Sequence, residues 1–171
     1  MERDSFAAEL EGAKASSTLQ LLFKAARLLD ERAIERLRRR TRLPVRAAHT
    51  TLLPHIDLEG TRLTELARRL GVSKQAVGQL VDELVAMGLL ERVADPADLR
   101  AKLVRFTKRG RAGLFEGLAV LRELEVELAD GLGAETMRTV HAALGAMVAR
   151  YGEDARREVA GATPSREERR R

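Results

Sequence analysis

The sequence predicts a mainly α-helical protein with one small β-hairpin wing, arranged as a winged helix-turn-helix between helices at both ends. Apolar residues recur every three or four positions over long stretches, the spacing of amphipathic helices. In the middle, two short helical patterns join at Gly71-Val72, and two short apolar runs with a turn signal at Asp95-Pro96 follow them. The 171 residues, with 44% hydrophobic and 33% charged, suit a globular domain of this class.

The N-terminal third predicts one long helix. Residues 1–16 are small and mixed, so we expect a flexible arm or a short helix there. A continuous apolar stripe then runs from Leu19 to Leu37, with Ser17 among the N-cap candidates. This pattern predicts a helix from residue 17 to about residue 40.

The segment from Leu63 to Asp82 has the spacing of a helix-turn-helix. A shorter helix over residues 45–53 ends at Pro54, and helices over 63–70 and 73–87 follow. Ala67 is small enough for a close crossing, Gly71 tolerates a positive φ in the turn, and Ser73 can cap the second helix. The alternative is a plain two-helix corner.

The second of these helices has a polar face suited to reading bases. Lys74, Gln75, Gly78 and Gln79 lie away from its apolar stripe. Glutamine can bond adenine through N6 and N7, and lysine can reach guanine or a phosphate. Gly78 costs roughly 1 kcal/mol relative to alanine in a helix, and its missing side chain would let DNA approach closely.

The hairpin predicted over residues 89–93 and 101–106 would form the wing. Arg100 is the candidate for insertion into a minor groove, and the Asp98 carboxylate could hold its guanidinium in place. Arg92 and Lys102, on the strands, are expected at phosphates. The alternative is an exposed hairpin whose surface ion pair contributes little stability.

The positive charge is concentrated in this part of the chain. Residues 62–111 hold eleven Lys and Arg against six Asp and Glu, an excess of five. The whole chain carries the same formal net charge of +5. The excess therefore coincides with the predicted helix-turn-helix and wing, which favours a duplex nucleic acid as partner.

Two more helices are predicted over residues 113–130 and 134–151, and a disordered charged tail over 152–171. The stripes of the terminal helices are too extensive for a small winged helix to cover. A second copy of the chain is the simplest partner, and a two-fold dimer would place two recognition helices about one DNA turn, ~34 Å, apart.

Composition excludes several other classes of protein. There is no Cys, so disulfide frameworks and thiolate zinc sites are excluded. The chain shows no secretory signal and no run of ~18 apolar residues, so we expect a cytoplasmic protein with no membrane partner. The spacing of the three His residues does not suit a metal site, and no phosphate loop or catalytic triad signature is present. We therefore expect no enzyme, no metal and no cofactor.

These motifs resemble the multiple antibiotic resistance regulator (MarR) family of winged-helix repressors. The resemblance rests on Leu66-Ala67, Gly71-Val72-Ser73, Gln75-Ala76-Val77, Leu80, Leu84, Gly88-Leu89, Arg92, Asp95-Pro96-Ala97-Asp98-Leu99-Arg100 and Thr107-Lys108-Arg109-Gly110. It implies a homodimer that binds a pseudo-palindromic operator, with recognition helices in major grooves and wings in flanking minor grooves. The residues expected at the DNA interface are Thr64, Ser73, Lys74, Gln75, Gly78, Gln79, Arg92, Asp98, Arg100 and Lys102.

The resemblance also implies a small-molecule effector bound between the dimer helices and the winged helix, where His49 and His55 are the candidate ligand-binding residues. The expected division is a dimerisation helix over 17–42, a DNA-binding domain over 43–111 and C-terminal dimerisation helices over 112–151. The function predicted is a ligand-responsive transcriptional repressor that binds double-stranded DNA. The alternative is a winged-helix module that binds a partner protein and no DNA, although such a module needs neither a basic recognition face nor a cationic wing tip.

Overall fold

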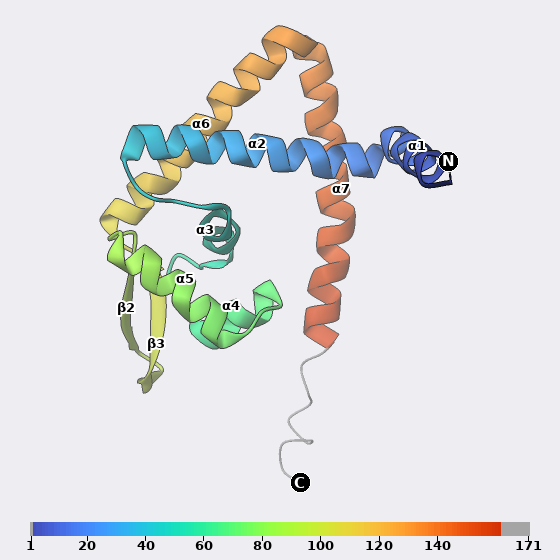
Figure 1. Ribbon diagram of the computed structural model, residues 1–171. Helices are drawn as coiled ribbons and strands as arrows, with labels where there is room; N and C mark the ends of the chain where they lie inside the picture. The colour runs from blue at the N-terminus through green and yellow to red at the C-terminus, as the bar shows by residue number, and fades with distance from the viewer. Residues whose placement is uncertain (1, 162–171) are drawn as a thin grey trace. The chain divides into compact units, whose positions relative to one another are not determined.

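The computed structural model describes the backbone of residues 2–161 and the side chains of residues 6–152. The chain forms two compact units, Met1–Leu124 and Glu125–Arg171. In chain order the elements are α1 (Glu2–Ser16), α2 (Thr18–Thr41), α3 (Ala47–Leu52), η1 (Leu53–His55), β1 (Thr61–Arg62), α4 (Leu63–Leu70), α5 (Lys74–Ala86), β2 (Leu90–Asp95), β3 (Asp98–Phe106), α6 (Lys108–Leu132) and α7 (Ala134–Gly161) (Figure 1). The predicted mainly α fold with a small hairpin is confirmed.

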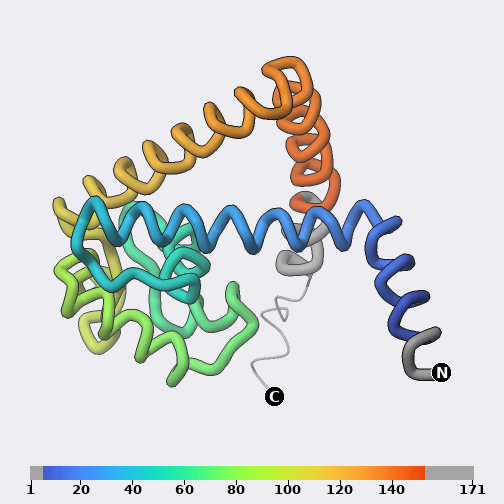
Figure 2. Tube along the Cα trace, turned by 45° about the horizontal axis from the view of Figure 1, so that its top comes forward, coloured from blue at the N-terminus to red at the C-terminus, as the bar shows by residue number. Residues whose placement is uncertain are grey.

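The N-terminal segment forms a short helix, the second of the two alternatives that the sequence left open, rather than a flexible arm. Residues 2–16 form α1, which leaves the start of α2 at an angle (Figure 2). The segment is rich in Ala and Glu, which are strong helix formers, and Lys14 pairs with Glu11 one turn earlier at 2.9 Å. Ser17 separates the two helices: its extended backbone ends α1, and its Oγ accepts a hydrogen bond from the Gln20 N–H at 3.4 Å.

The wing is a three-stranded antiparallel sheet in the order β1-β3-β2. β2 pairs with β3 from Leu90↔Phe106 to Ala94↔Lys102, and a register irregularity at Asp95 precedes the tip. β1, which the sequence did not predict, pairs Arg62 with Leu103. Two residues are too few to show any periodicity. β1 nevertheless joins the start of α4 directly to the middle strand of the wing.

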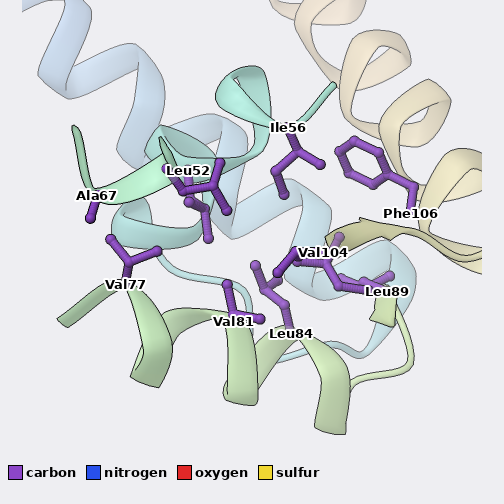
Figure 3. Packing of buried hydrophobic residues seen from close by; sticks show 11 residues of the cluster. Leu52, Ile56, Ala67, Val77, Val81, Leu84, Leu89, Val104 and Phe106 are labelled. Atoms are coloured by element: carbon purple, nitrogen blue, oxygen red, sulfur yellow. The ribbon is translucent and has the colours of Figure 1, made fainter. Parts of the chain in front are cut away.

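A core of aliphatic side chains joins α3, α4, α5 and the sheet (Figure 3). Leu66 of α4, Leu84 of α5 and Leu52 of α3 are fully buried in it. The cluster consists of Leu52, Ile56, Leu66, Ala67, Val77, Val81, Leu84, Leu89, Leu90, Val104 and Phe106. Ala67 lies at the helix crossing, as predicted, so the sequence pattern placed this core correctly.

Thr107 fixes α6 to the winged helix. Its Oγ donates to the Gly88 carbonyl at 2.7 Å and accepts from the Gly110 N–H at 2.9 Å, as an N-cap does. Its own N–H donates to the Leu89 carbonyl at 3.1 Å. The first turn of α6 therefore follows the backbone at the start of β2.

The C-terminal helix is longer than the sequence predicted. α7 continues to Gly161, so residues 152–161 of the predicted tail are helical, and residues 162–171 lie outside the described residues. The extension is rich in Ala, Glu and Arg, which favour a helix even where no apolar stripe exists. Within residues 2–161, no helix has the length and apolar character that crossing a membrane requires.

Candidate nucleic-acid interface

The turn between α4 and α5 has the backbone that the sequence predicted. Gly71 adopts the left-handed conformation with φ 66° and ψ 27°, and it ends α4. The Val72 N–H donates to the Ala67 carbonyl at 3.2 Å. Ser73 then caps α5, because its Oγ accepts from the Ala76 N–H at 3.2 Å. This geometry leaves the first turn of α5 exposed.

The exposed face of α5 contains most of the residues expected to read bases. Lys74, Gln75 and Gln79 are exposed, whereas Val77 is fully buried. Gly78 differs from the interpretation made from the sequence, because it is partly covered by α4. A Cβ there would meet Leu63 Cδ2 at 3.7 Å, an ordinary contact. The side of Gly78 on which a side chain would stand therefore faces α4 and not an open DNA-binding surface.

The wing and the two helices enclose a polar hollow. It measures about 460 Å³, and half of the predicted interface residues lie on its wall. Those residues come from the start of α4, the start of α5 and both wing strands; they are Thr64, Lys74, Arg92, Arg100 and Lys102. Ser73, Gln75, Gly78, Gln79 and Asp98 are outside it. The fold therefore brings together polar side chains that are up to 38 positions apart in the sequence.

Arg62, which the sequence analysis missed, also lies on the wall of this hollow. Its Nε donates to Asp95 Oδ2 at 2.6 Å, and the Asp95 carboxylate is nearly inaccessible to solvent. The Ala97 N–H, bonded to Asp95 Oδ1 at 2.9 Å, and then Arg62 hold the pKa of Asp95 below its usual value. The pair connects the residue before α4 to the base of the wing tip. Arg62 belongs to strand β1, which the sequence did not predict, so the sequence offered no signal for this contact.

Asp98 does not hold the Arg100 guanidinium, contrary to the prediction. Its Oδ1 accepts the backbone N–H of Arg100 at 3.1 Å, and its other oxygen lies 3.9 Å from Arg62 Nη2. The carboxylate thus shapes the turn, since it is two residues away and faces the backbone. The Arg100 side chain is exposed and has no acid partner among the described residues.

Ion pairs leave only part of the basic charge available to a ligand. Five of the eleven cations in residues 62–111 have an acid partner: Arg62, Arg68, Arg69, Arg92 and Arg105. Glu65 shows the effect clearly, because Arg68 and then Arg69 lower its pKa to about 2. Arg92, expected at a phosphate, is paired with Asp82. The cations without an acid partner among the described residues are Lys74, Arg100, Lys102, Lys108, Arg109 and Arg111.

The two candidate effector-binding histidines, His49 and His55, are engaged in contacts with neighbouring protein residues. His49 is fully buried, with Nε2 2.9 Å from Glu83 Oε2 and Nδ1 accepting the Arg46 N–H at 3.3 Å. Burial lowers its pKa. His55 contributes its carbonyl, which accepts from Arg69 Nη1 at 2.8 Å. Within the described residues no group of three metal-ligating side chains occurs.

An apolar cavity of about 450 Å³ lies nearby, between α2, α3, η1 and the first half of α6. Neither His49 nor His55 is on its wall, so the geometry does not support either as an effector ligand. Thr50 is the one residue of α3 on the cavity wall, and Phe106 of β3 lies on the side toward the sheet.

Comparisons with known proteins agree with this geometry. A model of the MarR family matches residues 43–101, which include the helix-turn-helix and the wing tip. The apo crystal structure of wild-type MarR from E. coli is 25% identical, with a TM-score of 0.62 over 77% of this chain and 97% of that chain. Over residues 43–101 this chain matches the MarR family. Members of this family are DNA-binding transcription regulators, and the match supports that class for this protein.

Two further MarR-like structures share the fold at lower identity. One is CouR from Rhodococcus jostii RHA1 bound to p-coumaroyl-CoA, at 21% identity and TM-score 0.58 over 78% of this chain and 93% of that chain. The other is the transcriptional repressor CouR bound to a 23-mer DNA duplex, at 22% identity and TM-score 0.59 over 78% and 94%. The ligands named belong to those proteins.

Proposed function

We propose that this MarR-family regulator is a repressor that binds a pseudo-palindromic operator as a homodimer and releases it when a small molecule binds. The observation that carries the DNA interface is the polar hollow between α5 and the wing. Its wall holds Lys74, Arg100 and Lys102, three cations without an acid partner among the described residues. Such charges attract phosphates and are not cancelled by neighbours.

The residues divide into three roles in this proposal. Gln75 and Gln79 on the exposed face of α5 read base edges in the major groove, because glutamine bonds adenine through two atoms. Arg100 enters the adjacent minor groove, and Thr64, Lys74 and Lys102 bind phosphates. Arg92 would join them only if a phosphate displaced its partner Asp82. Ser73, Gly78 and Asp98 shape the backbone at the interface.

The effector part of the proposal rests on the apolar cavity. It adjoins α3, whose opposite side contacts α5 through His49 and Glu83. A ligand that changes the position of α3 would therefore change that of the recognition helix. The CouR structures, one with a ligand and one with DNA, are consistent with both activities in one fold.

The first test measures affinity for a fluorescein-labelled duplex from the promoter of the protein's own gene at several salt concentrations. Affinity should fall steeply as salt rises, because bound cations displace counterions from the phosphates. Arg100→Ala should weaken binding about tenfold or more, a loss of ~1.4 kcal/mol. Arg111→Ala, which removes an unpaired cation on α6 outside the hollow, is the matched control. Affinity that does not depend on salt would favour the protein-interaction module instead.

The second test concerns base reading. Gln75→Ala and Gln79→Ala should each relax the sequence preference by about 1–3 kcal/mol at one base pair, because each removes a bidentate contact. Selection of bound duplexes from a randomised pool, followed by sequencing, measures this preference. Lys102→Ala is the control: it should lower affinity for all sequences alike. If both Gln variants select the wild-type sequence, α5 does not read bases through these residues.

A further inference from the structure

The apolar cavity has one charged side chain on its wall among the described residues, and that charge is negative. Asp30 of α2 is half-buried at the wall, and the remaining wall is aliphatic or aromatic apart from Thr50. No Lys, Arg or His lines it. A bound carboxylate or phosphate would therefore meet no cation and would lie beside a like charge.

The Asp30 carboxylate has no cation partner in the part of the chain that the structure describes. Its printed contact is with Thr50 Oγ1, at a long 3.4 Å. That hydroxyl also lies 2.9 Å from the Ala47 carbonyl, a better acceptor for its single hydrogen. Arg27, one turn earlier on α2, pairs with Glu31 at 2.7 Å instead. Asp30 is therefore available to a cationic ligand group.

The cavity exists because small residues stand where α2 and α6 face each other. Ala33 and Gly117 are both on the wall, and a Cβ at Gly117 would meet nothing within 4 Å. The deep end is formed by Val120, Ile34 and Phe106, each less than 10% exposed. The space thus has an apolar interior and a carboxylate on its wall, a combination that suits a ligand with an apolar body and one polar group.

We infer that the effector of this regulator is a cationic amphiphile, an aromatic or aliphatic body with a protonated amine that pairs with Asp30. This inference rests on the proposed function, because it specifies the ligand of the proposed effector site. Charge complementarity carries it. The Asp30 carboxylate attracts a cation and repels an anion, and the apolar wall strengthens both effects because it excludes water.

The experiment uses three probes of matched shape: 1-naphthylmethylamine, 1-naphthalenemethanol and 1-naphthoate. Binding to the full-length protein without DNA is followed by naphthalene fluorescence and by isothermal titration calorimetry. The amine should bind at least tenfold more tightly than the alcohol, and the carboxylate should bind most weakly. Asp30→Asn should abolish the preference for the amine, whereas Asp130→Asn, an exposed acid elsewhere on α6, should preserve it.

A second variant tests the location. Gly117→Leu should fill the cavity and weaken all three probes about tenfold or more, while circular dichroism shows an intact fold. Equal affinities for the three probes, or a preference for the carboxylate, would overturn the inference. The inference would also be overturned if none of the three probes bound and Gly117→Leu lost self-association. A second copy of the chain would then occupy the cavity. Failure of operator binding would leave these readouts unchanged, so the two proposals are tested separately.

Discussion

At the residue scale, Gly110 is the position with the least room for change. It is buried in the first turn of α6, and an added Cβ would overlap the Leu89 carbonyl. The Thr107 N–H already bonds that carbonyl, so the backbone at Leu89, just before β2, cannot move away without breaking this hydrogen bond. A glycine is thus required there by close approach of two backbones, and not by its φ angle.

Gly110→Ala should therefore destabilise the protein by about 1–3 kcal/mol, the usual cost of overpacking a tight site. The thermal and urea unfolding midpoints measure this loss. Gly117→Ala, two turns later on α6 and facing open space, is the control and should stabilise by roughly 0.5–1 kcal/mol. Equal midpoints for the two variants would show that the contact with Leu89 relaxes at no cost.

At the element scale, α3 is held to α5 by a charged cluster. Arg46 donates to Glu83 through Nη2 at 2.6 Å and Nε at 3.0 Å, and the buried His49 ring meets the same carboxylate. Arg46 holds the pKa of Glu83 below its usual value, with His49 adding to the effect. His49 has one nitrogen against a carboxylate and the other accepting an N–H, so the neutral ring fits both partners.

Protonation of His49 should cost stability in a defined pH range. Its pKa in the folded protein is below 6.5, so the unfolded chain takes up the proton first as pH falls. The contribution of His49 to stability is therefore complete above pH 6.5 and decreases below it. Urea midpoints should fall between pH 7.5 and 5.5 in the wild type, before Glu83 begins to titrate. His49→Asn, which keeps an acceptor for the Arg46 N–H, should remove most of this pH dependence, whereas the exposed His141→Asn should not.

The elements that the sequence predicted correctly are those with repeated patterns. α2, α4, α5 and the hairpin each extend over several residues of regular spacing, and the caps at Ser73 and Thr107 are local. The sequence could not reveal β1, the Arg62–Asp95 pair or the ring environment of His49, since each depends on contacts over 30 or more residues or on a two-residue strand. The role of Asp98 was predicted wrongly because a carboxylate two residues before an arginine can bond either its backbone N–H or its guanidinium, and only the folded structure shows that it is the backbone.

At the scale of the whole molecule, uncovered apolar faces favour self-association. Within α7, large apolar residues recur one or two turns apart and remain exposed: Val140, Leu144, Met147, Val148 and Tyr151. α2 likewise exposes Leu19 and Phe23 on its outer surface. Such stripes are costly in water, and a second copy of the chain is the simplest partner to cover them.

Val148 and Tyr151 provide the test of the proposed dimer, being 72% and 67% exposed. The double variant Val148→Asp, Tyr151→Asp should sediment as a monomer at micromolar concentrations where we expect the wild type to be a dimer. Its affinity for a two-half-site operator should fall more than its affinity for one half-site, because the linked second binding event is lost. Arg138→Asp and Arg150→Asp, polar exposed positions on the same helix, are controls for added negative charge. A dimeric double variant would place the interface elsewhere.

The Arg62–Asp95 pair limits how this molecule can respond to change. Because β1 and this pair connect the residue before α4 to the wing, we expect the helix-turn-helix and the wing to move as one body. In the proposed dimer, a ligand would then alter the distance between two such bodies but not the shape of either. Over evolutionary time, operators for this regulator should tolerate exchanged bases within a half-site more readily than one inserted base pair between half-sites, since an insertion displaces and rotates a whole half-site at once.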